Sequence, residues 1–297
     1  MALSRTTQSV LLILFSVALL AALSLMGKML GTDVLGDPLH PMQVSGARFT
    51  VALMCLLLVV RFNPVQFNDT PWRLHIKRSI AGWCGVTCLF AAVTVMPLAD
   101  ANAVSFLSVI VAMGLSMIML RERTGPYRWA AAVIALLGAL IITRPGTTAF
   151  QPAALIAVAA AVFIGFEMIF IKQLSGREAP MRILLINNTI GTSISIIAVS
   201  FVWQTPSPQQ WLFMCLIGSL MLGVQYTNIL AMQRSDASFI APFWYATPAF
   251  AALYDFLVFA EVLSLSSMIG ISLIIAGGVV ISWREGLAKK RMETESG

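Results

Sequence analysis

The 297-residue chain is 59% hydrophobic and only 11% charged, and its mean hydropathy is +0.87. Soluble domains usually carry about 25% charged residues, so this composition excludes a soluble globular protein and predicts an all-α integral membrane protein. The net charge of +6 does not indicate a nucleic-acid partner, because the basic residues fall in short gaps between apolar runs and do not gather on one arm or face.

Apolar runs of membrane-spanning length follow one another along the whole chain. A helix needs about 20 apolar residues to cross the hydrocarbon core of a bilayer. The third and fourth runs are separated only by LAD, and the eighth and ninth only by QRSDA. We therefore predict ten transmembrane helices, at residues 8–28, 42–60, 79–97, 101–120, 127–143, 152–172, 182–203, 211–232, 238–260 and 264–283.

The basic residues predict the orientation of these helices. Lys and Arg accumulate in cytoplasmic loops. When the N-terminus is placed inside, sixteen basic residues fall on the cytoplasmic side, and Lys28 and Arg144 fall outside. Both termini are thus predicted to be cytoplasmic.

The chain also repeats itself. Glu122 begins ERTGPYRWAAAVIALLGALIIT, and 139 residues later Glu261 begins EVLSLSSMIGISLIIAGGVVIS; the same offset places Arg48 on Asn187. We predict a five-helix unit at 1–146, a second copy at 147–286 and a cytoplasmic tail at 287–297. Because five is odd, the second copy must enter the membrane from the opposite side, which gives an inverted repeat.

Several short motifs carry a family resemblance. A Pro precedes the second predicted helix, Arg48 lies within it, a Glu closes the fourth and ninth helices, and the segments APFWY, FAE and SWRE follow near the end. This pattern resembles the drug/metabolite transporter superfamily, and more narrowly the EamA-type permeases. The resemblance implies a secondary carrier of a bacterial inner membrane, in which two inverted five-helix halves enclose a central cavity and work by alternating access.

No cofactor or metal is expected. The chain has no Gly-rich phosphate-binding loop, so ATP is not the direct energy source. The four cysteines lack C-x-x-C spacing and lie in apolar runs, which is typical of small core residues.

Three ionisable residues, Arg48, Glu167 and Asp255, fall well inside predicted helices. Charges inside a membrane are costly and usually face a cavity or a partner. Counted at 1.5 Å per residue, Glu167 lies roughly 7 Å from the midpoint of its helix, toward the cytoplasm. Residues at comparable depth on the eighth and ninth helices predict a polar and aromatic substrate-binding layer with Glu167, made of Gln225, Tyr226, Asn228, Trp244 and Tyr245.

The sequence leaves two interpretations of the role of Glu167 open. Apolar surroundings would favour its neutral form, so it could carry a coupling proton or bind a substrate amine; alternatively, it is a protonated structural residue bonded to a neighbouring helix. An ion pair between Arg48 and Asp255 would lower the cost of both charges. The family resemblance implies a structural or gating role for Arg48, and we predict a coupling or gating role for Asp255. Direct substrate contact by Arg48, and a place for Asp255 in a wet outer vestibule, are the alternatives.

Together these features predict a secondary active transporter of a small amphipathic metabolite, an amino acid or another amine-bearing compound, with the proton as the candidate coupling ion. Its expected partners are the substrate and the lipid bilayer, and the sequence leaves the oligomeric state open. The alternatives are an exporter of anionic metabolites or drugs, and a channel or structural membrane subunit. An enzyme is not expected, because the chain lacks H-E-x-x-H and G-x-S-x-G motifs.

Overall fold

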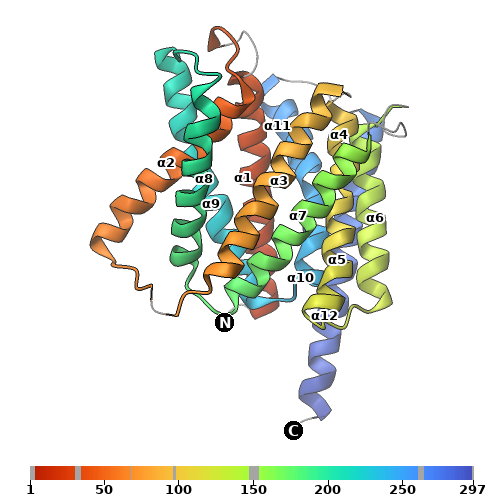
Figure 1. Ribbon diagram of the computed structural model, residues 1–297. Helices are drawn as coiled ribbons and strands as arrows, with labels where there is room; N and C mark the ends of the chain where they lie inside the picture. The colour runs from red at the N-terminus through yellow and green to blue at the C-terminus, as the bar shows by residue number, and fades with distance from the viewer. Residues whose placement is uncertain are drawn as a thin grey trace.

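The computed structural model describes residues 4–30, 35–67, 69–95, 98–146, 154–259 and 264–295. The described residues form helices and no strands (Figure 1). In chain order the helices are α1 (Arg5–Leu30), α2 (Pro41–Phe62), α3 (Trp72–Val95), α4 (Leu98–Ser105), α5 (Leu107–Met119), α6 (Pro126–Thr143), α7 (Ala154–Ser175), α8 (Pro180–Ser200), α9 (Pro208–Arg234), α10 (Ala237–Ile240), the 3-10 helix η3 (Ala241–Ala246), α11 (Thr247–Phe259) and α12 (Leu265–Glu295).

Eight helical segments in the described part of the chain are long and apolar enough to cross a membrane. One of them, Asp100–Met119, combines α4 with α5. The third predicted helix corresponds to α3, and the ninth corresponds to the segment from α10 through η3 to α11. Neither of them is among the eight candidate spans. The all-helical membrane fold is thus confirmed, whereas the count of ten spanning helices stays a prediction.

Helix packing joins residues 4–146, the first half, to residues 154–295, the second half. The most extensive pairs are α6 with α12, α3 with α7, α1 with α9 and α2 with α8, and each takes one helix from either half. The backbones of α6 and α12 approach each other closely at two glycines. A Cβ atom on Gly138 would lie 2.6 Å from the carbonyl oxygen of Gly270, and one on Gly270 equally close to that of Gly138. Small residues allow this contact, as is typical of helices packed in lipid.

The predicted continuous helix at 238–260 is interrupted. Residues Ala241–Ala246, which hold the APFWY motif, form η3 between α10 and α11. Pro242 and Pro248 remove two backbone N–H donors in this region, and a proline in a helix interior disrupts its hydrogen-bond ladder. The ninth predicted segment is thus helical, but it is not one regular α-helix.

The fourth predicted helix is also divided, at Phe106 between α4 and α5. This division lies against η3. The Tyr245 hydroxyl donates to the Phe106 carbonyl oxygen at 3.1 Å, and the two rings meet edge to face with centroids 6.0 Å apart. The two interrupted segments, one from each half, thus contact each other inside the bundle.

Both ends of the described chain lie at one end of the bundle, where α1 begins and α12 ends; we call this the termini end (Figure 1). Helix α12 continues to Glu295, so most of the predicted tail is an extension of the last helix. Its sequence from Glu285 onward is rich in Lys, Glu, Ala, Arg and Met, which favour helix.

Candidate substrate-binding site

Glu167 lies on α7, and its carboxylate faces a basic residue on α3. The Arg78 Nη2 atom is 3.8 Å from Glu167 Oε1, which makes an ion pair longer than a hydrogen bond. The Glu167 side chain is 26% exposed, whereas that of Arg78 is only 3% exposed. The sequence did not predict this basic neighbour of Glu167, because depth along a helix does not show which residue of the next helix a side chain meets.

A glycine on α3 makes room for the carboxylate. A Cβ atom added to Gly82 would lie 2.8 Å from both Glu167 Cδ and Oε1. One turn further along, a Cβ on Gly85 would lie 2.9 Å from Ile164 Cγ1. Arg78, Gly82 and Gly85 have i, i+4, i+7 spacing and so share one helix face, which packs against α7.

Sequence reasoning missed Arg78, which it assigned to a cytoplasmic loop. In the structure Arg78 lies within α3, and its Nε and Nη1 atoms are buried with no hydrogen-bond partner among the described residues. The signal that could have found it is the spacing of this arginine with two glycines on one helix face, because small residues mark close helix contacts.

Arg48 is a second basic residue near this pair. It lies on α2, its Nε atom is buried without a hydrogen-bond partner in the described part of the chain, and its charge interacts with that of Glu167. Its guanidinium carbon is 4.6 Å from the centroid of the Phe49 ring, within range of a cation–π contact. The side chain of Asp255 lies outside the described residues, as does Glu261, so the Arg48–Asp255 ion pair stays a prediction.

The residues predicted to form a polar layer have different environments. Gln225 on α9 is buried, and its Oε1 atom accepts from Asn187 Nδ2 at 3.3 Å and from Asn188 Nδ2 at 3.4 Å, both on α8. Asn228 Oδ1 and Trp244 Nε1 are buried without hydrogen-bond partners among the described residues. These are side chains that a polar ligand could satisfy.

The two tyrosines of the predicted layer do not share one environment. Tyr245 is fully buried, and its hydroxyl is committed to the Phe106 carbonyl. Tyr226 is 40% exposed. The two residues therefore differ in orientation although their depths along the helices are similar.

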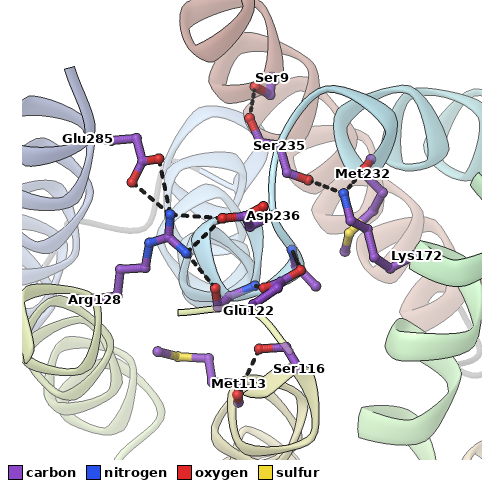
Figure 2. Close-up of polar contacts among 12 residues, drawn as sticks. Ser9, Met113, Ser116, Glu122, Arg128, Lys172, Met232, Ser235, Asp236 and Glu285 are labelled. Carbon is purple, nitrogen blue, oxygen red and sulfur yellow. Dashed lines mark hydrogen bonds and ion pairs between the residues drawn. The ribbon is translucent and has the colours of Figure 1, made fainter. Parts of the chain in front are cut away.

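A second polar group lies at the termini end, centred on Arg128 at the start of α6 (Figure 2). Its Nη1 atom donates to Asp236 Oδ2 at 3.0 Å and to Ser238 Oγ at 2.6 Å. Its Nη2 atom donates to the same Asp236 oxygen at 3.0 Å and to Glu285 Oε2 at 2.8 Å. Glu122 accepts from the backbone N–H groups of Ala237 at 2.8 Å and Ser238 at 2.9 Å.

Further hydrogen bonds extend this group to α7 and α1 (Figure 2). Lys172 Nζ donates to the carbonyl oxygens of Met232 and Ser235, both at 2.6 Å. Cations are favourable at the last carbonyls of a helix, which is where Lys172 meets α9. The Ser9 and Ser235 hydroxyls are 2.6 Å apart. We call this whole set, from Ser9 to Glu285, the termini-end network; it connects α1, α6, α7, α9, α10 and α12.

A polar pocket of about 340 Å³ also lies at this end, lined by Arg5, Gln8, Gln233 and Arg234. None of the predicted site residues lines it, so the central cavity stays a prediction. In the described residues, no three His, Cys, Asp or Glu side chains are grouped so that they could hold a metal ion.

Comparison with known proteins places the chain in a family. The model of the EamA-like transporter family matches residues 7–144 and again residues 151–283. The chain belongs to this family. It is thus related to transporters and not to enzymes, as the motifs predicted.

Named relatives differ in what they transport. The chain is 26% identical over 259 residues to an S-adenosylmethionine uptake transporter of Rickettsia felis, which covers 86% of this chain and 88% of the relative. It is 27% identical to a riboflavin transporter of Vibrio cholerae (74% and 75% covered) and 25% identical to the pseudopaline exporter CntI of Pseudomonas aeruginosa (79% and 81% covered). Uptake and export both occur among these relatives, so the family does not set the direction of transport.

A solved crystal structure shares the fold. It superposes with a TM-score of 0.79 at 20% sequence identity, and the match covers 94% of this chain and 98% of the other.

Proposed function

We propose that this protein is a secondary active transporter that moves a small amphipathic, amine-bearing metabolite across the bacterial inner membrane by alternating access. The observation that carries the proposal is the Glu167 carboxylate, held inside the helical bundle against Arg78 across the α3–α7 contact between the two halves. A charge within a membrane costs about 2.5–3.5 kcal/mol on insertion scales, and a substrate site is the usual reason for a chain to keep one there.

The pattern of helix packing supports an inverted repeat. The third helix of the first half, α3, packs on the first helix of the second half, α7; conversely, α1 packs on α9, the third helix of the second half. Exchanging the halves maps one pair onto the other, as a two-fold axis in the membrane plane requires. Helix breaks near substrate sites are common in such transporters, and here the break at Phe106 meets η3.

Glu167 has two possible tasks within this proposal. Because the Glu167 carboxylate is partly exposed, it can receive the substrate amine. The same exposure allows the carboxylate to exchange a proton. The S-adenosylmethionine transported by one relative is an amino-acid derivative and fits the first task. Both tasks use the same atoms, so substrate binding and proton release would compete at Glu167.

The excess of basic residues at the termini end supports a cytoplasmic location of both termini. The termini-end network then lies on the cytoplasmic side and has to separate when the site opens inward. A cysteine at the exposed Thr205 should react with an impermeant thiol reagent added from the periplasm, and one at the exposed Gln66 should not. The reverse pattern would overturn this orientation.

Counterflow in proteoliposomes tests the function. Vesicles containing the purified protein would be preloaded with one unlabelled compound from a panel of S-adenosylmethionine, riboflavin and the standard amino acids, and then given the labelled form outside. A carrier should show label uptake above that of vesicles loaded with buffer, because exchange is faster than net transport. Equal label uptake with and without preloading would indicate a channel instead.

A further inference from the structure

Resting on the proposed function, we infer that His75 and Glu178 form a second closure of the cytoplasmic end, and that this closure takes up a proton when it opens. The inward-open state is then favoured as the cytoplasm becomes more acidic. His75 lies near the start of α3 in the first half, and Glu178 lies in the connection between α7 and α8 in the second half. Neither residue belongs to the termini-end network.

The two side chains are joined inside the protein. His75 Nε2 lies 2.7 Å from Glu178 Oε2, and the two side chains are only 1% and 2% exposed. Arg182 Nη1 donates to the second oxygen of Glu178 at 3.3 Å, and Gln233 Nε2 donates to its backbone carbonyl, also at 3.3 Å. Gln233 lines the pocket at the termini end. The pair therefore connects α3 to α8 and α9 at the end of the bundle that we propose to be cytoplasmic.

The hydrogen bonds around Glu178 indicate where the proton of this pair lies. Each oxygen of Glu178 faces one nitrogen, as suits an ionised carboxylate that only accepts, and the start of α8 at Pro180 favours its negative charge. His75 Nε2 is then the donor. Its Nδ1 atom is buried with no hydrogen-bond partner among the described residues. A second proton on the ring would place an N–H group there without an acceptor, which is costly in a buried site.

The charges that face His75 in this closed arrangement come from three residues in the described part of the chain: Glu178, Arg182 on α8 and Arg78, one turn further along α3. His75 precedes the predicted span at 79–97. Burial lowers the pKa of its ring, and the hydrogen bond to Glu178 acts against this shift. The two arginines repel an imidazolium and so act in the same direction as burial. The closed pair therefore holds His75 in its neutral form.

Opening of the cytoplasmic end changes the protonation of His75. When the halves separate there, water reaches both side chains, and a solvated histidine titrates at about pH 6.5. Between the lowered pKa of the closed pair and about pH 6.5, the open state thus binds more protons than the closed state. The state that binds more protons is stabilised as the pH falls. Acid therefore favours the open state, and higher pH favours the closed one.

A cysteine reporter tests the inference on the protein in proteoliposomes with a membrane-permeant thiol reagent. Ser175→Cys would report opening, because Ser175 is 4% exposed and ends α7 just before Glu178. Gln66→Cys, at an exposed position, corrects for the effect of pH on the thiol itself. Both are made after the four native cysteines have been replaced by alanine. From about pH 7.5 to pH 5.5 the reactivity ratio of the two should rise roughly three- to tenfold, the effect of one histidine proton. A constant ratio would reject the inference.

Histidine variants identify the group that titrates. His75→Gln keeps a donor in place of Nε2 but does not titrate, so the ratio should stay low at both pH values. His40→Gln is the matched control, because His40 is the other histidine of the chain and caps α2. It should keep the full pH dependence. Equal pH dependence in the two variants would overturn the inference.

A direct measurement covers the case in which His75→Gln does not fold. In the His40→Gln protein His75 is the single histidine, so NMR of labelled histidine follows the protonation of its ring. The ring should become protonated over the same pH range in which the reporter becomes reactive, and a ring that stays neutral there would exclude the proposed proton uptake. None of these measurements uses a substrate, so their failure leaves the transporter proposal intact. Exchange of no compound in the counterflow panel would reject that proposal itself.

Discussion

Arg78 and Arg128 are both arginines that connect the first half of the chain to the second, yet their surroundings are opposite. Arg128 places its two terminal nitrogens on Asp236, Ser238 and Glu285 at 2.6–3.0 Å. Arg78 is more buried, with 3% of its side chain exposed against 12% for Arg128, but it has a single carboxylate at 3.8 Å. The more buried arginine is thus the less satisfied one.

The two arginines therefore have different roles in the same helical bundle. At the termini end the protein itself supplies hydrogen-bond partners for both terminal nitrogens of Arg128, so the network holds helices from both halves together. Beside Glu167, the buried Nε and Nη1 atoms of Arg78 have no hydrogen-bond partner among the described residues. A ligand could supply the missing acceptors. The four predictions that follow test this contrast, starting from the largest expected effect.

Glu167→Gln should have the largest effect on transport and little effect on folding, because glutamine keeps the size of the side chain and can still hydrogen-bond. If Glu167 binds the substrate amine, affinity should fall by about 1.5–3 kcal/mol, roughly 10- to 150-fold. If it carries the coupling proton, accumulation against a gradient and its pH dependence should disappear while exchange persists. Counterflow and uptake at several pH values would distinguish these outcomes, and wild-type values in all of them would leave Glu167 a structural residue.

Gly82→Ala should move the Glu167 carboxylate without changing any charge. The new Cβ atom would meet Glu167 Cδ at 2.8 Å, and the flexible side chain has to turn away from α3. We expect a roughly tenfold loss of substrate affinity, since about 1.4 kcal/mol corresponds to a factor of ten. Gly114→Ala is the control, because nothing lies within 4 Å of its Cβ position; a similar loss there would show that the effect is not local.

Arg128→Gln should weaken the termini end and leave the substrate site intact. Because Asp236 and Glu285 are partly exposed, we expect a stability loss of only about 1–2 kcal/mol. A cysteine at the fully buried Ala241 should then react several-fold faster with a thiol reagent. Arg123→Gln, at an exposed position nearby in sequence, should not change that rate. An unchanged rate in Arg128→Gln would show that the network does not hold this end closed.

Tyr245→Phe should have the smallest effect. It removes the hydrogen bond to the Phe106 carbonyl and keeps the ring contact, which predicts a loss of about 1 kcal/mol in thermal unfolding. Tyr226→Phe, on the 40% exposed tyrosine, should be neutral. Equal effects of the two substitutions would contradict the different roles that we assign to these rings.

The sequence by itself determined the class of the protein and its family, and it singled out Glu167 as a candidate site residue. Each of these depends on local information: the hydropathy of a run, the spacing of short motifs, and one carboxylate inside an apolar segment. Depth along a helix also follows from the sequence, because each residue adds about 1.5 Å.

Only the tertiary structure determined the direction in which each side chain points and the residues that it contacts. Membrane helices are apolar on nearly all sides, so the pattern of polar residues does not fix their rotation. Tyr226 and Tyr245 were therefore predicted to share a layer, and packing exposed one and buried the other. Arg78 could be recognised as the partner of Glu167 only when Gly82 had brought α3 against α7, because the contact joins residues 89 positions apart in the chain through the shape of two helix surfaces.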